Sequence, residues 1–422
     1  MSGHHRSLPL YCVIGADALS CAGNAMTTIA IPLIVLNHGY SAAEVGLSSA
    51  AASLPIVIGA LAGGSFADRV GYRTTSVISD AASGVTVPAL GLLAQLHMLP
   101  LWALLALVFV FLSNLMDAPG SGARASQIPD LTRLAGVPLT RSTGIRSTLG
   151  RLATMLGSAA AGVVVSLTSP DVALYINAVC FLISIAVTML MVPSDAALRQ
   201  EGVRDTIAPV SDGMSLRDFF AGAAFIAHTP LVRAIVIMVV LTNLLDSAAM
   251  NVLWALYART VSSDGAWYGV MTAILAAGAL TGAACYGAFG RRYSSRWVFL
   301  LMFVCACLPP CCCMAAQIPF PLVLAVIAIA GLSAGSINPM IDTILYALIP
   351  GDIRARTLGA MTAAVTAGMP FGSVMAGYLG QSMPLPLAFA IIGGCYVGVF
   401  VLTGFGRHWR RFDESFRHAT EV

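Results

Sequence analysis

The chain has 422 residues, of which 58% are hydrophobic and only 10% are charged, and its mean hydropathy is +0.85. These values lie far from those of soluble globular proteins, so they predict an integral membrane protein without a separate soluble domain. The formal net charge is +3, and all 22 basic residues are arginine. Because these arginines are spread over several short connections and form no continuous stripe, a nucleic-acid-binding surface is excluded.

Windows of about twenty apolar residues predict twelve membrane-spanning helices. In chain order they cover roughly 10–36, 44–66, 73–96, 100–122, 144–168, 171–192, 231–258, 265–288, 296–316, 321–348, 356–380 and 385–406. The connection at 193–230 is long and rich in charge, which predicts a cytoplasmic linker between an N-terminal domain (1–192) and a C-terminal domain (231–422). Its last part, from Leu216, is amphipathic and predicts a helix lying in the membrane interface.

The arginines also predict the orientation of the chain. They fall in alternate connections between spans, and only Arg259 falls on the opposite side. By the positive-inside rule, both termini are cytoplasmic and the number of spans is even. We expect a multi-pass protein of the plasma membrane that acts as a monomer.

The two halves of the sequence resemble each other. Ile128-Pro129 follows the fourth predicted span and Ile349-Pro350 follows the tenth, and in both places arginines and a glycine-rich span come next. A weak internal repeat of six helices predicts an all-α membrane protein made of two pseudo-symmetric six-helix bundles. Chance similarity between glycine-rich spans is the alternative.

Polar residues inside the spans are the candidates for a transport site. Such groups cost several kcal/mol in hydrocarbon unless they face a cavity or a partner. They occur in pairs on every third predicted span, at separations that place both members on one helix face: Asp17 and Asn24, Asn114 and Asp117, Asn243 and Asp246, Asn338 and Asp342. This pattern predicts a polar passage for substrate and protons. The alternative is that the pairs hold neighbouring helices together by hydrogen bonds.

Proton coupling is one chemistry that these acids could support. Loss of water disfavours the charged form of a carboxyl group, and a passage that opens to either side changes its hydration. Asp17, Asp246 and Asp342 are therefore candidates for loading and releasing a proton. Such an acid can instead recognise a cationic substrate. Asp117 lies seven residues before Arg124 and is expected to join an ionic network with the loop at Asp68.

That loop, between the second and third spans, reads Gly-Ser-Phe-Ala-Asp-Arg-Val-Gly-Tyr-Arg over residues 64–73. It resembles the signature of the major facilitator superfamily, whose characteristic positions are occupied here by Gly64, Asp68, Arg69, Gly71 and Arg73. Phe66 replaces the usual leucine and Tyr72 the usual first basic residue. The resemblance covers essentially the whole chain, and the segment that begins at Ala125 is similar to the branch containing macrolide and siderophore exporters.

The resemblance implies a major facilitator fold and a gating role for the motif, in which Asp68 meets the positive end of the eleventh span on closure. Arg124 is expected to belong to the same gate. The sequence contains no nucleotide-phosphate loop, zinc-ligand spacing or nucleophile elbow, so no enzyme activity is expected. The ten cysteines lie mostly in apolar spans and are expected to pack there as small side chains. We predict no cofactor and no metal site.

The predicted function is proton-driven export of a hydrophobic or amphipathic small molecule, with the lipid bilayer and protons as the other partners. Drug-like or siderophore-like substrates suit apolar spans that carry a few carboxyl groups. The alternatives are an importer or lipid transporter of the same fold and a non-transporting membrane receptor or assembly partner.

Overall fold

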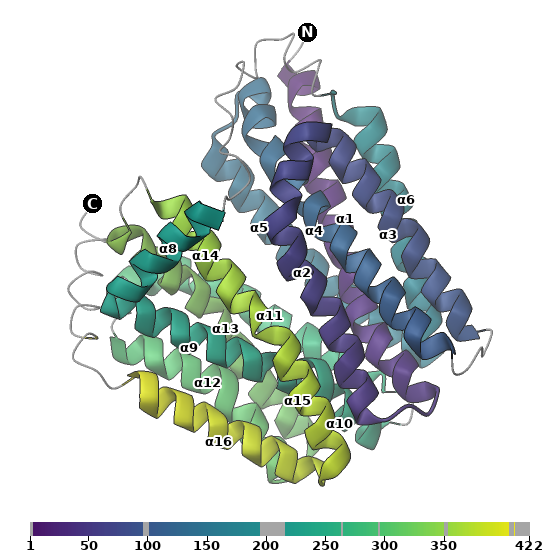
Figure 1. Cartoon of the computed structure of the whole chain (residues 1–422), viewed down its shortest axis with the longest axis vertical. Coiled ribbons are helices and arrows are strands. Elements are labelled where there is room, and N and C mark those ends of the chain that lie inside the picture. The colour runs from purple at the N-terminus through teal and green to yellow at the C-terminus, as the bar shows by residue number, and fades with distance from the viewer. Residues whose placement is uncertain are drawn as a thin grey trace. The chain divides into compact units, whose positions relative to one another are not determined.

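The computed structural model describes residues 3–95, 101–194, 216–262, 265–293, 296–349, 353–404 and 409. All regular secondary structure within these residues is helical (Figure 1). The all-α prediction is therefore confirmed. Apolar side chains such as Leu190 and Leu402 are 77% and 82% exposed, as expected for helices whose outer faces contact lipid.

The first half of the chain forms six long helices. They are α1 (Gly3–Asn37), α2 (Ala42–Val70), α3 (Tyr72–Gln95), α4 (Leu101–Ala135), α5 (Leu139–Leu167) and α6 (Pro170–Met191). Each of the first six predicted spans falls on one of them. α4 runs well beyond the predicted end at residue 122. Pro119 and Pro129 both lie within this helix, and neither ends it.

The second half begins with the helix expected at the membrane interface, α8 (Leu216–His228). It continues with α9 (Pro230–Ala248), the π-helix η1 (Ala249–Leu253), α10 (Trp254–Val261), α11 (Trp267–Tyr293), α12 (Arg296–Ala315), α13 (Phe320–Leu348), α14 (Arg354–Ala367), α15 (Met369–Ser382) and α16 (Leu385–Gly404). The predicted span 231–258 thus consists of three consecutive segments. The predicted span 356–380 is divided at Gly368, where Pro370 occupies the first turn of α15.

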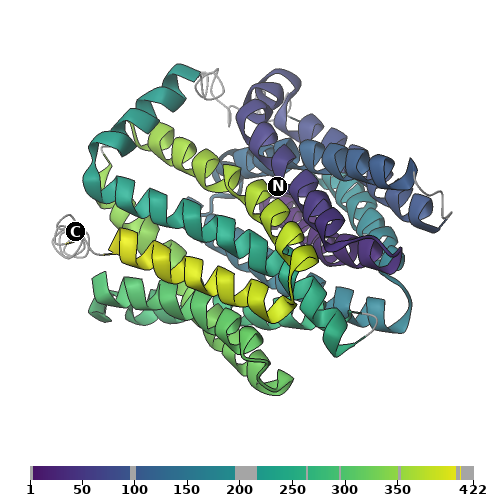
Figure 2. The same ribbon diagram turned by 60° about the horizontal axis from the view of Figure 1, so that its bottom comes forward.

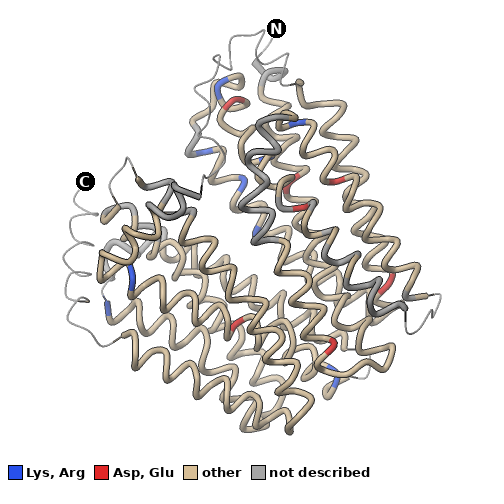
Figure 3. Tube along the Cα trace, in the orientation of Figure 1, with Lys and Arg blue, Asp and Glu red and all other residues tan. Residues whose placement is uncertain are grey.

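The helices are suited to a membrane by both length and composition. Within the described ranges, nine of them are long and apolar enough to cross a bilayer. All twelve predicted spans fall on helices. Figure 3 shows the charged residues as isolated positions along the tube of the chain.

The chain divides into two compact units. Unit 1 contains Met1–Ile34 and Ala51–Gly213, and unit 2 contains Val35–Ala50 and Met214–Val422. The start of α2 is therefore grouped with unit 2. The predicted domain boundaries at 192 and 231 stay a prediction.

Unit 2 contains a close contact between α11 and α13, built on two Gly-x-x-x-Gly pairs. Gly278 and Gly282 on α11 face Gly331 and Gly335 on α13, and the Cβ of any other residue at these four positions would meet the backbone of the opposite helix. Small residues at this spacing let two membrane helices approach closely. Elsewhere in unit 2, α9 packs against α15 and α16 (Figure 2).

Candidate functional site

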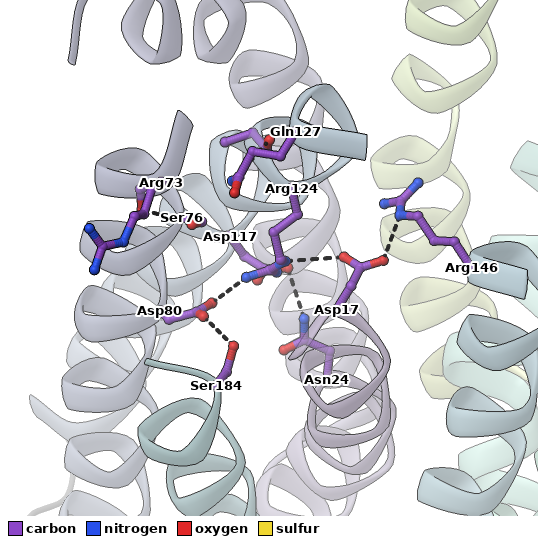
Figure 4. Close-up of polar contacts among 11 residues, drawn as sticks. Asp17, Asn24, Arg73, Ser76, Asp80, Asp117, Arg124, Gln127, Arg146 and Ser184 are labelled. Atoms are coloured by element: carbon purple, nitrogen blue, oxygen red, sulfur yellow. Dashed lines mark hydrogen bonds and ion pairs between the residues drawn. The ribbon is translucent and has the colours of Figure 1, made fainter. Parts of the chain in front are cut away.

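An arginine with two carboxylate partners is buried in unit 1. Arg124 on α4 donates from Nε to Asp17 Oδ1 on α1 at 3.1 Å and from Nη1 to Asp80 Oδ1 on α3 at 2.7 Å (Figure 4). Arg124, Asp17 and Asp80 are 2%, 5% and 1% exposed. We call these three residues, together with Arg146 and Asp117 described below, the ionic cluster.

The remaining oxygens of the two buried aspartates also have partners. Arg146 on α5 forms an ion pair with Asp17 at 2.9 Å between Nε and Oδ2. This contact is an electrostatic one, because the Nε–H of Arg146 is not aligned for a hydrogen bond. Ser184 on α6 donates its hydroxyl to Asp80 Oδ2 at 2.6 Å. Both acids therefore have partners on other helices, and these contacts compensate the cost of removing charged groups from water.

Asp117 differs from these two acids. Its Oδ2 accepts a hydrogen bond from the Asn24 side-chain amide at 2.8 Å. Its Oδ1 is buried and has no hydrogen-bond partner among the described residues. Within this part of the chain, no guanidinium forms an ion pair with Asp117, although Arg124 lies on the same helix.

The spacing of these residues explains how two helices bring them together. Asp17 and Asn24 are seven residues apart on α1, and Asp117 and Arg124 are seven residues apart on α4. Two helical turns place each pair on one face. Arg124 contacts Asp17, and Asn24 contacts Asp117, which is the pairing of two antiparallel helices in register.

A glycine on α4 allows α3 to lie close to this face. A Cβ at Gly120 would collide with the side chain of Ser79 on α3. Ser79 directly precedes Asp80, so the close approach of the two helices brings the Asp80 carboxylate to Arg124. Any larger residue at position 120 would move the acid away.

Unit 2 has polar contacts of a different kind around Asp246 on α9. The Tyr396 hydroxyl on α16 donates to Asp246 Oδ1 at 2.5 Å, and the Cys307 thiol on α12 also lies within hydrogen-bonding reach of this carboxyl. The Asn243 amide instead donates to the Val239 carbonyl of its own helix at 2.9 Å. The predicted pair on α9 therefore has separate partners.

A cavity of about 260 Å³ lies in unit 2 where α10, the end of α12 and the start of α16 meet. Its lining includes Tyr257, Thr260, Met314, Gln317 and Leu385. Within the described part of the chain, no group of three or more His, Cys, Asp or Glu side chains is arranged to hold a metal ion. The ionic cluster is accordingly the strongest candidate for a functional site.

Sequence comparison identifies the family. A family model described as transmembrane secretion effector, within the major facilitator superfamily, matches residues 10–415. The chain belongs to this family. The superfamily prediction is confirmed, and the protein is a multi-pass membrane transporter of small molecules and not an enzyme.

The relatives of this chain include efflux pumps. It is 27% identical over 390 residues to the multidrug efflux pump Tap of Mycolicibacterium fortuitum, and this match covers 90% of this chain and 91% of the relative. It is 25% identical over 395 residues to Tap of Mycobacterium tuberculosis, covering 90% and 89% of the two chains.

Solved structures of transporters share its fold. The nucleoside transporter NupG superposes with a TM-score of 0.72 and 14% identity, over 93% of this chain and 98% of that one. The inward-open xylose transporter XylE of E. coli has a TM-score of 0.70 and 14% identity, over 93% and 95%. At this identity the likeness shows the major facilitator fold alone.

The superfamily signature is described only at its C-terminal end. Gly71 has a φ of +96°, which explains the glycine between α2 and α3. Arg73 donates to the carbonyls of Thr188 and Met189 at 3.4 and 2.5 Å, at the C-terminal end of α6. The Thr188 carbonyl also accepts from the Val192 N–H that caps α6, so the guanidinium adds a second donor there and binds the Met189 carbonyl in the last turn of the helix. The side chains of Asp68 and Arg69 and the surroundings of Gly64 lie outside the described residues.

The remaining residues of the predicted polar pairs differ in their exposure. Asn114 is partly buried, Asn338 is exposed, and the side chain of Asp342 lies outside the described part. The placement of the four polar pairs along a passage stays a prediction. The sequence analysis missed Asp80 and Arg146 as members of the site. The signal for Asp80 is that it is an acid inside an apolar span. Arg146 is one of the arginines whose positions predict the orientation of the chain, and its spacing gives no sign of a contact with Asp17.

Proposed function

We propose that the protein exports hydrophobic or amphipathic drug-like molecules by alternating access, in exchange for protons. The observation that carries this proposal is similarity to efflux pumps named for multidrug transport over 90% of the chain. The ionic cluster supports the proton step, because it places several ionisable groups inside the spans of unit 1. The residue pairs predicted from the sequence, including Asp246 and Asp342, belong to the same proposal.

The proposal also includes the place of the protein and its gate. The protein lies in the plasma membrane with both termini in the cytoplasm. The signature residues Gly64, Asp68, Arg69, Gly71 and Arg73 form the cytoplasmic gate of the alternating cycle. This role is supported by the resemblance of the loop to the superfamily signature.

The test is drug accumulation in inside-out membrane vesicles that contain the protein. When the interior is acidified, exchange for protons should drive uptake of those drugs to which cells producing the protein show reduced susceptibility. A protonophore should abolish this uptake, and vesicles without the protein give the background. Uptake that is driven only in right-side-out vesicles would identify an importer. An absence of drug, metabolite and lipid movement in both orientations would favour a receptor or assembly partner.

A further inference from the structure

The ionic cluster contains more acids than bases. Asp17, Asp80 and Asp117 contribute three carboxyl groups, and Arg124 and Arg146 contribute two guanidinium groups. If every group is ionised, one negative charge of the cluster is uncompensated, and only the Arg146 side chain of the two bases is partly exposed, at 30%. An uncompensated charge inside a span costs several kcal/mol, and one bound proton removes that cost.

The hydrogen bonds identify the carboxyl group that can take this proton. Asp17 contacts guanidinium groups through both oxygens, and Asp80 contacts Arg124 and the Ser184 hydroxyl. A proton on either acid would have to displace one of these donors. Asp117 needs no such displacement, because its Oδ1 is buried without a partner while Oδ2 accepts from Asn24.

We propose that Asp117 is the proton-carrying group of unit 1, binding one proton at Oδ1 while Asp17 and Asp80 keep their contacts with Arg124. Asn24 positions the carboxyl group by its hydrogen bond to Oδ2 in both protonation states. The proposal rests on the proposed exchange of drug for protons and names the site at which unit 1 takes part in it.

Several charged and polar groups surround Asp117, so its protonation state affects their contacts. α1 contributes Asp17, Asn24 and the Cys21 thiol, α3 contributes Asp80, and Arg124 lies on α4 itself. Arg146 on α5 acts on this set through Asp17. When Asp117 loses its proton, it becomes a third carboxylate that attracts Arg124. The protonation state of Asp117 therefore changes the balance of the contacts that Arg124 makes with α1 and α3.

Infrared difference spectroscopy of the purified full-length protein, recorded between acid and alkaline pH, tests this without a substrate. A protonated carboxyl gives a C=O stretching band that carboxylates lack. We expect such a band to titrate in the natural protein and to be absent in Asp117→Asn. Asp246→Asn serves as the matched control and should leave the Asp117 band unchanged.

A second variant separates proton binding from a merely structural role. In Asn24→Ala the carboxyl keeps its proton but loses the amide donor, so the band should move to higher frequency. Asp117→Asn should fold, because it removes the uncompensated charge, and gel filtration with thermal unfolding checks this.

Several outcomes would overturn the assignment. They are a set of titrating C=O bands that is the same in the natural protein and in Asp117→Asn, so that the substitution removes none, and an Asp117 band that Asn24→Ala leaves in place. A charge that stays fixed on Asp117 at all pH values would indicate a site for a cation instead of a proton. If the Asp117 band titrates but vesicle uptake ignores the pH gradient, the proposed exchange fails and the proton-binding site remains.

Discussion

Arg124 is buried and forms ion pairs with two carboxylates, those of Asp17 and Asp80. Removing one member of a buried ion pair leaves charge without compensation, which typically costs about 3–5 kcal/mol. We expect Arg124→Gln to lower the free energy of unfolding by about this amount, measured by thermal unfolding in detergent.

The matched control is Arg133→Gln on the same helix. The Arg133 side chain is 66% exposed and lies 4.0 Å from Asp130, and exposed pairs of this kind contribute only about 0–1 kcal/mol. Equal unfolding temperatures for the two variants would show that the cluster contributes nothing to stability.

The spacing of residues in the sequence predicted which members of the site share a helix face. Separations of seven residues placed Asp17 with Asn24 and Asp117 with Arg124 on common helix faces, because these relations are local to one helix. The partners of these residues were not predictable. The contact of Asp246 with Tyr396 joins residues 150 positions apart, and only the packing of α9 against α16 creates it.

The close contact between the helices α11 and α13 predicts how a substitution at Gly282 affects stability. A Cβ at Gly282 would collide with the backbone carbonyl of Leu332, which cannot rotate away as a side chain can. Inserting one methyl group into such a contact typically costs about 1–3 kcal/mol. We expect Gly282→Ala to reduce the thermal unfolding temperature and the yield of folded protein.

Gly394→Ala on α16 is the control, because nothing lies within 4 Å of a Cβ at that position. Alanine is favoured over glycine in a helix by roughly 0.5–1 kcal/mol, so this variant should be as stable as the natural protein or slightly more stable. If both substitutions had the same effect, helix propensity alone would account for it and the close contact would not.

Hydropathy predicted the existence and approximate ends of the helices, since an apolar run of the right length identifies a span. It did not predict the extension of α4 to Ala135, because the added turns are polar and a hydropathy window ends with the apolar run. It also missed η1, since a wider helical turn leaves composition unchanged. The division at Gly368 depends on the Pro370 that follows it.

The arrangement of the whole molecule in the membrane is open to a direct measurement. The alternating arginines predict that the C-terminus is cytoplasmic and that the connection between Val261 and Trp267 lies on the other side. A reporter that is active only in the cytoplasm should therefore work when fused after Val422 and fail when inserted in that connection. The opposite pattern would reverse the orientation and with it the direction of the proposed transport.

The π-helix η1 has a consequence for anyone who compares or redesigns this chain. Its wider turn accommodates one residue more than a regular helix, so every side chain after Leu253 is rotated by about 100° from where an α-helical count would place it. Trp254, Ala255 and Ala258 are buried in this rotated frame. A relative with a regular helix here should align with a one-residue gap inside 249–253, and a chimaera joined across this point must keep the extra residue for α10 to present its apolar face inward.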